Sequence, residues 1–151
     1  MTTLPRGGKL DQSPTHLLHR AVQSASELFA AEVGPQGLTP RQYAILITIA
    51  QHEGISQTGL VERTGIDRST LADVVRRMIG KGLIQRKRTR QDARTYAVKL
   101  SEKGRQALDS ADPAARAADE RLVSDMNAPQ RKAFIELLQM AISSAGPAHD
   151  L

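Results

Sequence analysis

A dense group of cationic side chains lies in the middle of the sequence. The segment RKRTRQDAR, residues 86–94, contains five Lys or Arg side chains and one aspartate. Lys and Arg at this density neutralise phosphates and bind polyanions. The segment alone is also typical of a solvated tail or a membrane-surface patch, so the sequence around it has to distinguish these three possibilities.

Charge is unevenly distributed along the 151 residues. The stretch 63–99 contains 11 Lys or Arg and three acidic residues, whereas the remainder contains 10 basic and 13 acidic residues. The net charge of +5 and the pI near 10.0 therefore come from the central third of the chain. This segregation indicates an acidic partner for the centre and a different role for the two ends.

The cationic segment lies between two stretches with the two-residue period of β-strands. LIQRKR (83–88) and RTYAVKL (94–100) are predicted strands, with Tyr96, Val98 and Leu100 alternating against Thr95, Ala97 and Lys99. TRQDA (89–93) is then the turn of a hairpin, and the cationic side chains lie at its tip.

Two predicted helices precede this hairpin. A short helix over 57–64, capped by Ser56, runs into Gly65, and a longer helix over 68–81 follows, with Gly82 as its left-handed end. Asp67, or less readily Ser69, caps the longer helix. Its inward face is predicted to carry Leu71, Val74, Val75, Met78 and Ile79. A short helix, a glycine-containing turn and a longer helix form a helix-turn-helix pattern.

A helix-turn-helix followed by a hairpin is a winged helix, which fits a helix into the major groove of DNA and arginine into the minor groove. Arg68, Ser69 and Thr70 are predicted to contact phosphates or base edges from the first helical turn, and Arg76 and Arg77 to neutralise phosphates. The complete predicted DNA-binding set is Arg68, Ser69, Thr70, Asp73, Arg76, Arg77, Arg86, Lys87, Arg88, Arg90, Asp92 and Arg94.

Asp92 and Arg94 have the i, i+2 spacing that places both side chains on one face of a strand. The carboxylate can then hold the guanidinium in position for DNA. The alternative is that Asp92 is a turn residue and Arg94 a solvated charge.

The ends of the chain are predicted to be helical. Ser13-Pro14 and Thr39-Pro40 are N-cap signals with proline at the first helical position. Ser101 caps a long helix through Met126 in which Pro113 is expected to cause a kink or break, and Pro129 opens a last helix. The fold class is therefore mainly α with a small β-hairpin wing (α+β). The predicted organisation is a flexible leader over 1–12, dimerisation helices over 13–38 and 101–145, and a winged helix-turn-helix domain over 39–100.

Over residues 13–145 the chain resembles the MarR family of bacterial transcription regulators. The resemblance is carried by LTPRQYAIL (38–46), DRSTLADVVRRMIGKGLIQR (67–86), the DAR of residues 92–94, and LSEKGR (100–105). It implies an obligate homodimeric winged helix-turn-helix protein, usually a repressor, that binds a palindromic operator. It also implies release by a small anionic or aromatic ligand, such as a phenolic acid or its coenzyme A thioester.

A dimer explains the apolar stripes of the terminal helices. The first helix and the last two are expected to interleave with their copies, which would hide Leu17, Leu18, Phe29, Phe134 and Leu138 and hold two wings about 34 Å apart. If about six to ten phosphates are neutralised, affinity falls about 10³ to 10⁵-fold between 50 and 200 mM salt.

In the family, a ligand pocket lies between the first, second and fifth helices. The candidate ligand-binding residues here are His16, His19, Arg20, Arg41 and Tyr43, with Leu17, Phe29 and Leu46 as possible apolar wall. The cationic groups near the start of the first helix favour an anionic effector. The alternatives are that His16, His19 and Arg20 are surface residues, or that the i, i+3 histidines bind zinc or copper, for which no acid cluster lies nearby.

Other functional classes find less support in the sequence. The chain has no cysteine, which excludes disulfides and thiolate metal sites. No phosphate-binding glycine loop, nucleophile elbow or paired acidic motif points to an enzyme, and no cofactor is expected. Without a signal-peptide stretch or an apolar span, the expected location is the cytoplasm, associated with the bacterial nucleoid and not with a membrane. An effector-independent architectural DNA-binding protein remains the alternative to a ligand-responsive regulator.

Overall fold

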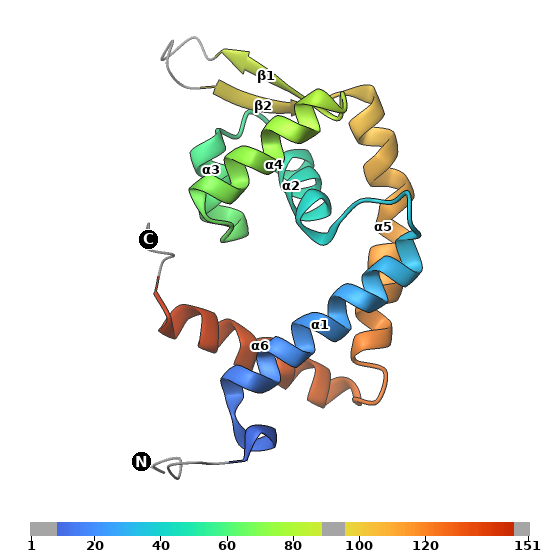
Figure 1. Ribbon diagram of the computed structural model, residues 1–151, viewed down its shortest axis with the longest axis vertical. Helices are drawn as coiled ribbons and strands as arrows, with labels where there is room; N and C mark the ends of the chain where they lie inside the picture. Colours follow the sequence, from blue (N-terminus) through green and yellow to red (C-terminus); the bar gives the residue numbers. More distant parts are fainter. Residues whose placement is uncertain (1–8, 89–95, 147–151) are drawn as a thin grey trace.

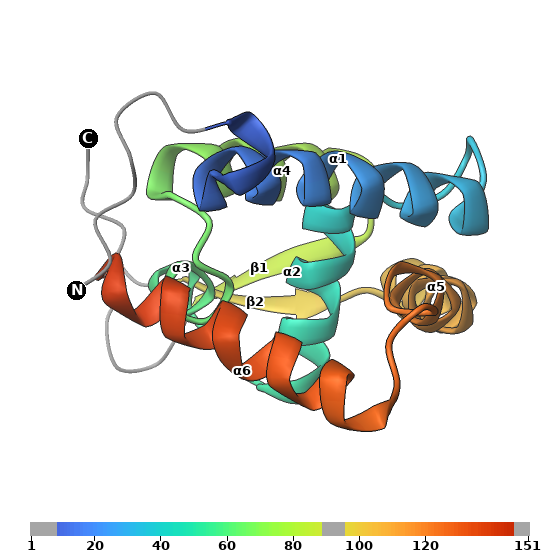
Figure 2. The same ribbon diagram turned by 90° about the horizontal axis from the view of Figure 1, so that it is seen from below.

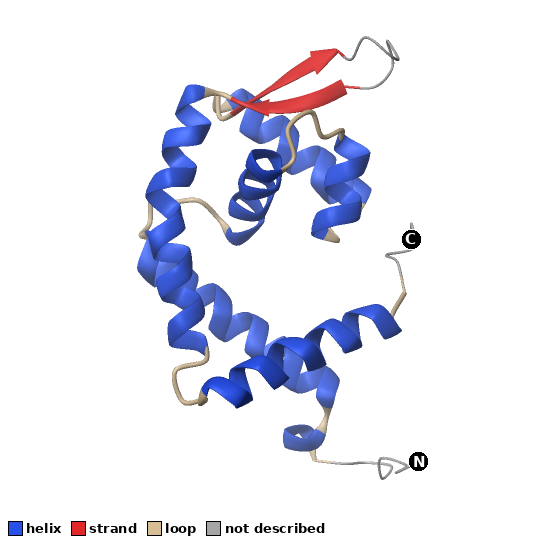
Figure 3. Cartoon of the chain, turned by 180° about the vertical axis from the view of Figure 1, so that it is seen from behind, coloured by secondary structure: helices blue, strands red, loops and turns tan. Residues whose placement is uncertain are grey.

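The computed structural model describes residues 9–88 and 96–146 as six α-helices and a two-stranded sheet (Figures 1 and 3). In chain order the elements are a 3-10 turn at Leu10–Gln12, α1 (Pro14–Val33), α2 (Pro40–Gln51), α3 (Gln57–Thr64), α4 (Arg68–Gly80), β1 (Ile84–Arg88), β2 (Tyr96–Leu100), α5 (Glu102–Leu122) and α6 (Ala128–Ser144). The predicted fold class is confirmed.

Five of the helices begin at the side-chain caps predicted from the sequence, each accepting a backbone N–H three residues on. The capping residues are Ser13, Thr39, Ser56, Asp67 and Ser101. Asp67, and not Ser69, caps α4. For α6 the sequence indicated Pro129, whereas the cap is Asn127, whose side chain accepts the N–H of Gln130 at 3.0 Å.

Some element boundaries, and the course of the helix at Pro113, differ from the expectation. The 3-10 turn at Leu10–Gln12 precedes Ser13, so regular structure begins inside the predicted leader. Helix α5 ends at Leu122, because Ser124 and Met126 N–H groups close turns on the carbonyls of Arg121 and Val123. Of the kink or break predicted at Pro113, the break is wrong: α5 continues through Pro113, with buried alanines on either side.

The core has two parts. The larger is built by α2, α3, α4 and the hairpin with the start of α5, and its most buried side chains include Ile45, Leu46, Leu60 and Leu71. The smaller joins α1 to α5 where Phe29 packs with Ala115 and Ala118. Tyr43 packs against both parts, so α2 connects the helix-turn-helix to the α1–α5 pair.

The hairpin is antiparallel, with Ile84 opposite Leu100 and Arg88 opposite Tyr96. The predicted alternation is seen in β2, where Val98 and Leu100 are buried and Lys99 between them is exposed. The Val98 N–H donates to Ile55 O at 3.0 Å and thereby ties the sheet to the start of the helix-turn-helix.

A tight joint connects the turn after α4 to the start of α5. The N–H of Ser101 donates to Leu83 O at 3.1 Å, its hydroxyl donates to Gly82 O, and Lys103 Nζ donates to Lys81 O at 2.9 Å. Gly104 lies against the Leu83 carbonyl so closely that a Cβ there would overlap the oxygen. From this joint α5 runs as one helix down the side of the molecule to α6, and it is seen end-on in Figure 2.

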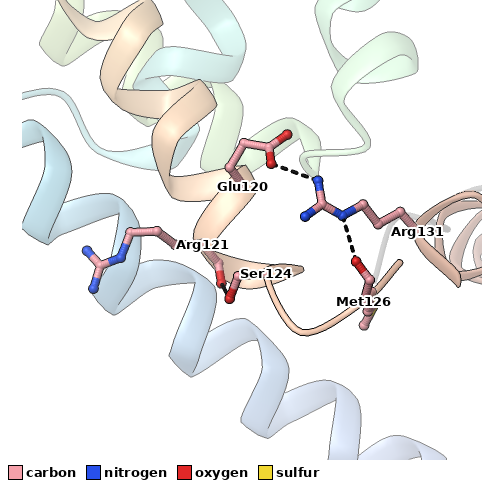
Figure 4. Close-up of polar contacts among 5 residues, drawn as sticks. All are labelled: Glu120, Arg121, Ser124, Met126 and Arg131. Atoms are coloured by element: carbon pink, nitrogen blue, oxygen red, sulfur yellow. Dashed lines mark hydrogen bonds and ion pairs between the residues drawn. The ribbon is translucent and has the colours of Figure 1, made fainter. Parts of the chain in front are cut away.

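Helix α6 crosses α1 in the view of Figure 1 but lies at a different depth, as Figure 2 shows, and it has no buried residue. Arg131 connects its first turn to the end of α5 and the following loop. Arg131 Nη1 lies 2.7 Å from Glu120 Oε2, and its Nε donates to Met126 O at 3.0 Å (Figure 4). Ile135, Leu137, Met140 and Ile142 along α6 are more than half exposed.

Within the described ranges 9–88 and 96–146, no helix is both long and apolar enough to cross a membrane.

Candidate nucleic-acid interface and adjoining hollows

Helix α4 separates an apolar face from a polar face. Leu71, Val75 and Met78 are fully buried on one side. On the other side Ser69, Thr70, Ala72, Asp73 and Arg76 line a shallow surface hollow of about 500 Å³, and Arg68 is exposed beside them. The polar face predicted for α4 is therefore accessible to a large partner.

The first turn of α4 is fixed by its cap. Asp67 Oδ1 accepts the Thr70 N–H at 2.8 Å, and this hydrogen bond holds the pKa of the Asp67 carboxyl below its ordinary value. A charged cap at a helix N-terminus is stabilising because it complements the helix dipole. The neighbouring residues 68–70 are thus presented on an ordered turn.

Asp73 lies between two arginines on the same helix. Its carboxylate pairs with Arg76 one turn on, and its Oδ2 lies 3.1 Å from Arg77 Nη2. Both guanidinium side chains are more than 70% exposed. Such exposed pairs add little stability, but they restrict the rotamers of two cations on the accessible side of α4.

In the described part of the wing, Arg86 and Arg88 are exposed and share a face of the sheet with Tyr96. Each guanidinium carbon lies 6.0 Å from the centre of the Tyr96 ring, the distance of a cation–π contact. Lys87, opposite Ala97, belongs to the other face. The predicted contacts Arg90, Asp92 and Arg94 lie outside the described residues.

A hollow of about 340 Å³ lies between α1, α2 and α5. We call it the aromatic hollow because Phe29 and Tyr43 form its wall, with ring centroids 5.9 Å apart. The remaining lining residues are Val22, Ala25, Ser26, Pro40, Ala115, Ala118, Asp119 and Leu122. An apolar cavity with a few polar groups is the usual form of a small-molecule site.

Tyr43 is held by a polar network with α5. Its hydroxyl donates to Asp112 Oδ1 at 2.8 Å, and Asp112 Oδ2 accepts from Arg116 Nε at 3.0 Å. Burial, reinforced by the Asp112 carboxylate, raises the pKa of Tyr43 to about 12. The phenol therefore stays neutral at physiological pH.

A second hollow of about 500 Å³ adjoins the first and shares Val22, Ser26 and Pro40 with it. We call it the arginine hollow because Arg41 of α2 and Arg77 of α4 line it, with Thr39, Gln42 and Val74. The two hollows together offer an apolar chamber beside two guanidinium groups, and one of these belongs to α4.

The ligand-binding residues predicted from the sequence are only partly brought together. Tyr43 and Phe29 line the aromatic hollow and Arg41 lines the arginine hollow, whereas His16, His19 and Arg20 line neither. His19 lies one turn ahead of Val22 on the same face of α1.

Three apolar residues have surroundings that differ from those expected from the sequence. Leu46 was expected in the pocket wall, but it is fully buried in the larger core. Phe29 was expected to be hidden by a partner chain, but Ala115 and Ala118 of its own α5 bury it. Leu17 is 45% exposed and lines neither hollow.

The alternative that His16 and His19 bind a metal ion receives no support from additional ligands. Among the residues that the structure describes, no group of three or more His, Asp or Glu side chains could hold a metal ion.

Sequence reasoning missed the residues that α5 and the wing contribute. Ala111, Ala115 and Ala118 recur at helical spacing, a signal of close helix approach that could have indicated the α1–α5 contact. Tyr96 could have been found from the strand register, which sets it opposite Arg88. Nothing local marks Asp112 as the partner of Tyr43.

Comparisons with known proteins agree with this architecture. The MarR family model matches residues 38–96. The HTH-type transcriptional repressor NicR of Pseudomonas putida is 31% identical, with 94% of each chain covered.

Solved structures with similar folds include two regulators that bind or respond to a small molecule. PcaV of Streptomyces coelicolor, in complex with its natural ligand, superposes with a TM-score of 0.86 at 27% identity, covering 96% of this chain and 99% of PcaV. BpsR of Bordetella bronchiseptica, whose DNA binding is regulated by 6-hydroxynicotinic acid, gives a TM-score of 0.77 at 26% identity, covering 84% and 96%.

Proposed function

The chain belongs to the MarR family of transcription regulators, and from that premise we propose that it is a homodimeric repressor released from a palindromic operator by a small aromatic anion. The observation that carries the proposal is the aromatic hollow, which adjoins two arginines, one of them on the DNA-reading helix α4. A ligand spanning both hollows would act directly on the orientation of that helix.

The DNA-binding half of the proposal rests on two cationic surfaces. In α4, Arg68, Ser69, Thr70, Asp73 and Arg76 form the face that would enter a major groove. Arg77 lies at the edge of this face, over the arginine hollow, where it would meet a backbone phosphate or the effector. In the wing, Arg86, Lys87 and Arg88, with the predicted contacts Arg90 and Arg94, would neutralise phosphates and enter the minor groove. The predicted contact Asp92 would hold the Arg94 guanidinium in position.

The dimer is proposed from apolar residues that this protomer leaves uncovered. Leu137, Met140 and Ile142 of α6 are 62–71% exposed, and Leu17 and Val22 of α1 are 45% and 65% exposed. Large apolar side chains clustered at this exposure mark association surfaces. A second copy pairing through α1 and α6 would bury them and set the two wings on a two-fold axis.

The proposed effector is an aromatic ring with one carboxylate. The ring would occupy the aromatic hollow between Phe29 and the alanines of α5, and the neutral Tyr43 hydroxyl and Ser26 would meet its hydroxyl substituents. Within that hollow the charged lining residue is the acidic Asp119, so the carboxylate would point away from it, toward Arg41. A coenzyme A thioester would need the arginine hollow for its larger body.

The DNA half is tested by isolating the fragments of genomic DNA that the protein retains and measuring affinity by fluorescence anisotropy. We expect specific DNA to bind at least about 10³-fold more tightly than bulk DNA, with a steep salt dependence. A ratio near one would favour the architectural alternative. Light scattering that finds a monomer at the concentrations of the assay would refute the dimer.

The effector half is tested with 4-hydroxybenzoate and its coenzyme A ester as probes on the same complex. Loss of a charged hydrogen bond costs about 1.5–3 kcal/mol, so Arg41→Ala should weaken the response about 10- to 100-fold. Arg105→Ala, exposed on α5 and outside both hollows, is the matched control. Separate His16→Ala, His19→Ala and Arg20→Ala variants test the remaining predicted residues, of which His19, one helical turn ahead of the lining residue Val22, should matter most.

A further inference from the structure

A third hollow, of about 460 Å³, is lined by the end of α1, the α1–α2 connection, the turn after α4 and the first part of α5. We call it the lysine hollow, and its lining residues are Glu32, Val33, Gln36, Gly37, Leu38, Gln42, Lys81, Leu83, Lys103, Ala107, Ser110, Ala111 and Ala114. It shares no lining residue with the aromatic hollow and shares Gln42 with the arginine hollow. Apart from Gln42, a ligand here would therefore meet other side chains than the proposed effector.

The floor of the lysine hollow is apolar. Leu83 and Ala111 are buried there, and Val33, Leu38 and Ala107 are half-buried. A hollow of this size lies within the range of cavities that accept small organic molecules, roughly 300–1,000 Å³. The floor suits the hydrocarbon or aromatic body of such a molecule.

The rim of the lysine hollow is cationic. Lys81 and Lys103 both line it, and Lys103 Nζ is held at the rim by its 2.9 Å hydrogen bond to Lys81 O. An ammonium has three donors, so this bond leaves Lys103 able to bind an anion.

The acidic lining residue of this hollow has another partner. Glu32 Oε1 lies 3.0 Å from Arg121 Nη1, so its charge is compensated along the α1–α5 contact. The field inside the hollow is therefore set by the two lysines.

From this combination of apolar floor, cationic rim and compensated acid, we propose that the lysine hollow is a second binding site, for an amphiphilic organic anion with one carboxylate. The carboxylate pairs with Lys81 and Lys103, and the apolar body covers Leu38, Leu83 and Ala107. The proposal does not rest on the proposed operator or effector, because binding in the lysine hollow is measured on the protein alone, without DNA.

The absence of cysteine from the sequence makes a site-specific test possible. Ser110→Cys, at the exposed rim of the lysine hollow, carries a trifluoromethyl label for ¹⁹F NMR, and Ala25→Cys carries the same label in the aromatic hollow. The probe is 2-naphthoate, with neutral 2-naphthalenemethanol as its uncharged counterpart. We expect naphthoate to shift the label at residue 110 saturably and the alcohol to bind at least tenfold more weakly.

Two changes separate this site from the proposed effector site. Lys81→Ala with Lys103→Ala should weaken naphthoate binding at residue 110 at least tenfold, whereas Lys132→Ala on exposed α6 should leave it unchanged. Ala114→Phe should abolish the naphthoate-induced shift of the label at residue 110 and leave the label at residue 25 responsive. Ala25→Phe, in the protein labelled at residue 110, should leave the shift at residue 110 unchanged. The proposal is overturned if saturating naphthoate leaves the label at residue 110 unmoved, or if the double lysine variant binds as tightly as the parent.

Discussion

Replacing Gly104 with alanine tests the joint between the hairpin and α5. A Cβ at residue 104 would overlap Leu83 O and lie 2.9 Å from Leu83 C. Because the overlap with the oxygen is closer still, and Cβ atoms do not approach other atoms to within about 3.0 Å, the Leu83 peptide has to withdraw by about 1 Å or more. Backbone on both sides of the contact is held by hydrogen bonds, so neither side can yield freely.

The expected cost has three contributions. Overpacking of this kind costs about 1–3 kcal/mol, and loss of the hydrogen bond from Ser101 N–H to Leu83 O costs about 0.5–1.5 kcal/mol more. Alanine regains about 0.8–1.0 kcal/mol over glycine within a helix. The net destabilisation is therefore about 0.5–3.7 kcal/mol, which corresponds to a fall in Tm of roughly 1–15 °C for a chain of this length.

The assay is urea unfolding followed by circular dichroism at a fixed protein concentration, because association would make stability depend on concentration. Gly80→Ala is the matched control. Gly80 is helical, has an ordinary φ, and offers open space to a Cβ, so its replacement should be neutral or stabilising by up to about 1 kcal/mol. A Gly104→Ala protein as stable as the parent would refute the tight joint.

Three further outcomes are expected. In a Tyr96→Phe protein, absorbance at 295 nm should report one tyrosine, Tyr43, ionising near pH 12, and Asp112→Asn should lower that pKa. Because the pKa of Tyr43 in the folded state is raised above 10, its contribution to the stability of the fold is complete below pH 10 and is lost as the pH rises toward 12. Asp73→Asn should strengthen binding to bulk DNA, measured by anisotropy at several salt concentrations, since it frees two arginines; weaker binding would mean that the carboxylate positions them. Ser101→Ala should cost about 1 kcal/mol in urea unfolding through loss of the α5 cap, and an unchanged midpoint would count against the cap.

The helix starts could be predicted because a cap is a local interaction. Ser13, Thr39 and Ser101 each bond to a backbone group three residues away, so residue type and spacing carry the whole signal. The two-residue alternation that predicted the hairpin strands is an equally local signal, because it is read from adjacent residues. The α+β fold class followed from the order of these elements.

The ligand hollows could not be located in the same way, because their walls come from distant segments. Tyr43 and Asp112 are 69 positions apart, and nothing in either neighbourhood links them. His16, His19 and Arg20 attracted attention because they are close in sequence and polar. Whether a side chain lines a cavity depends on how α1 crosses α5, and Phe29 with the small alanines fixes that crossing nearer the C-terminal end of α1.

The contacts of Arg131 have a kinetic consequence for assembly. They fix the departure angle of α6 while its apolar face is still uncovered. An arm that already points in one direction loses little conformational freedom when a second copy docks on it. Association of two such protomers would then require no refolding step. The exchange of protomers between dimers would be limited by the rate at which a dimer dissociates.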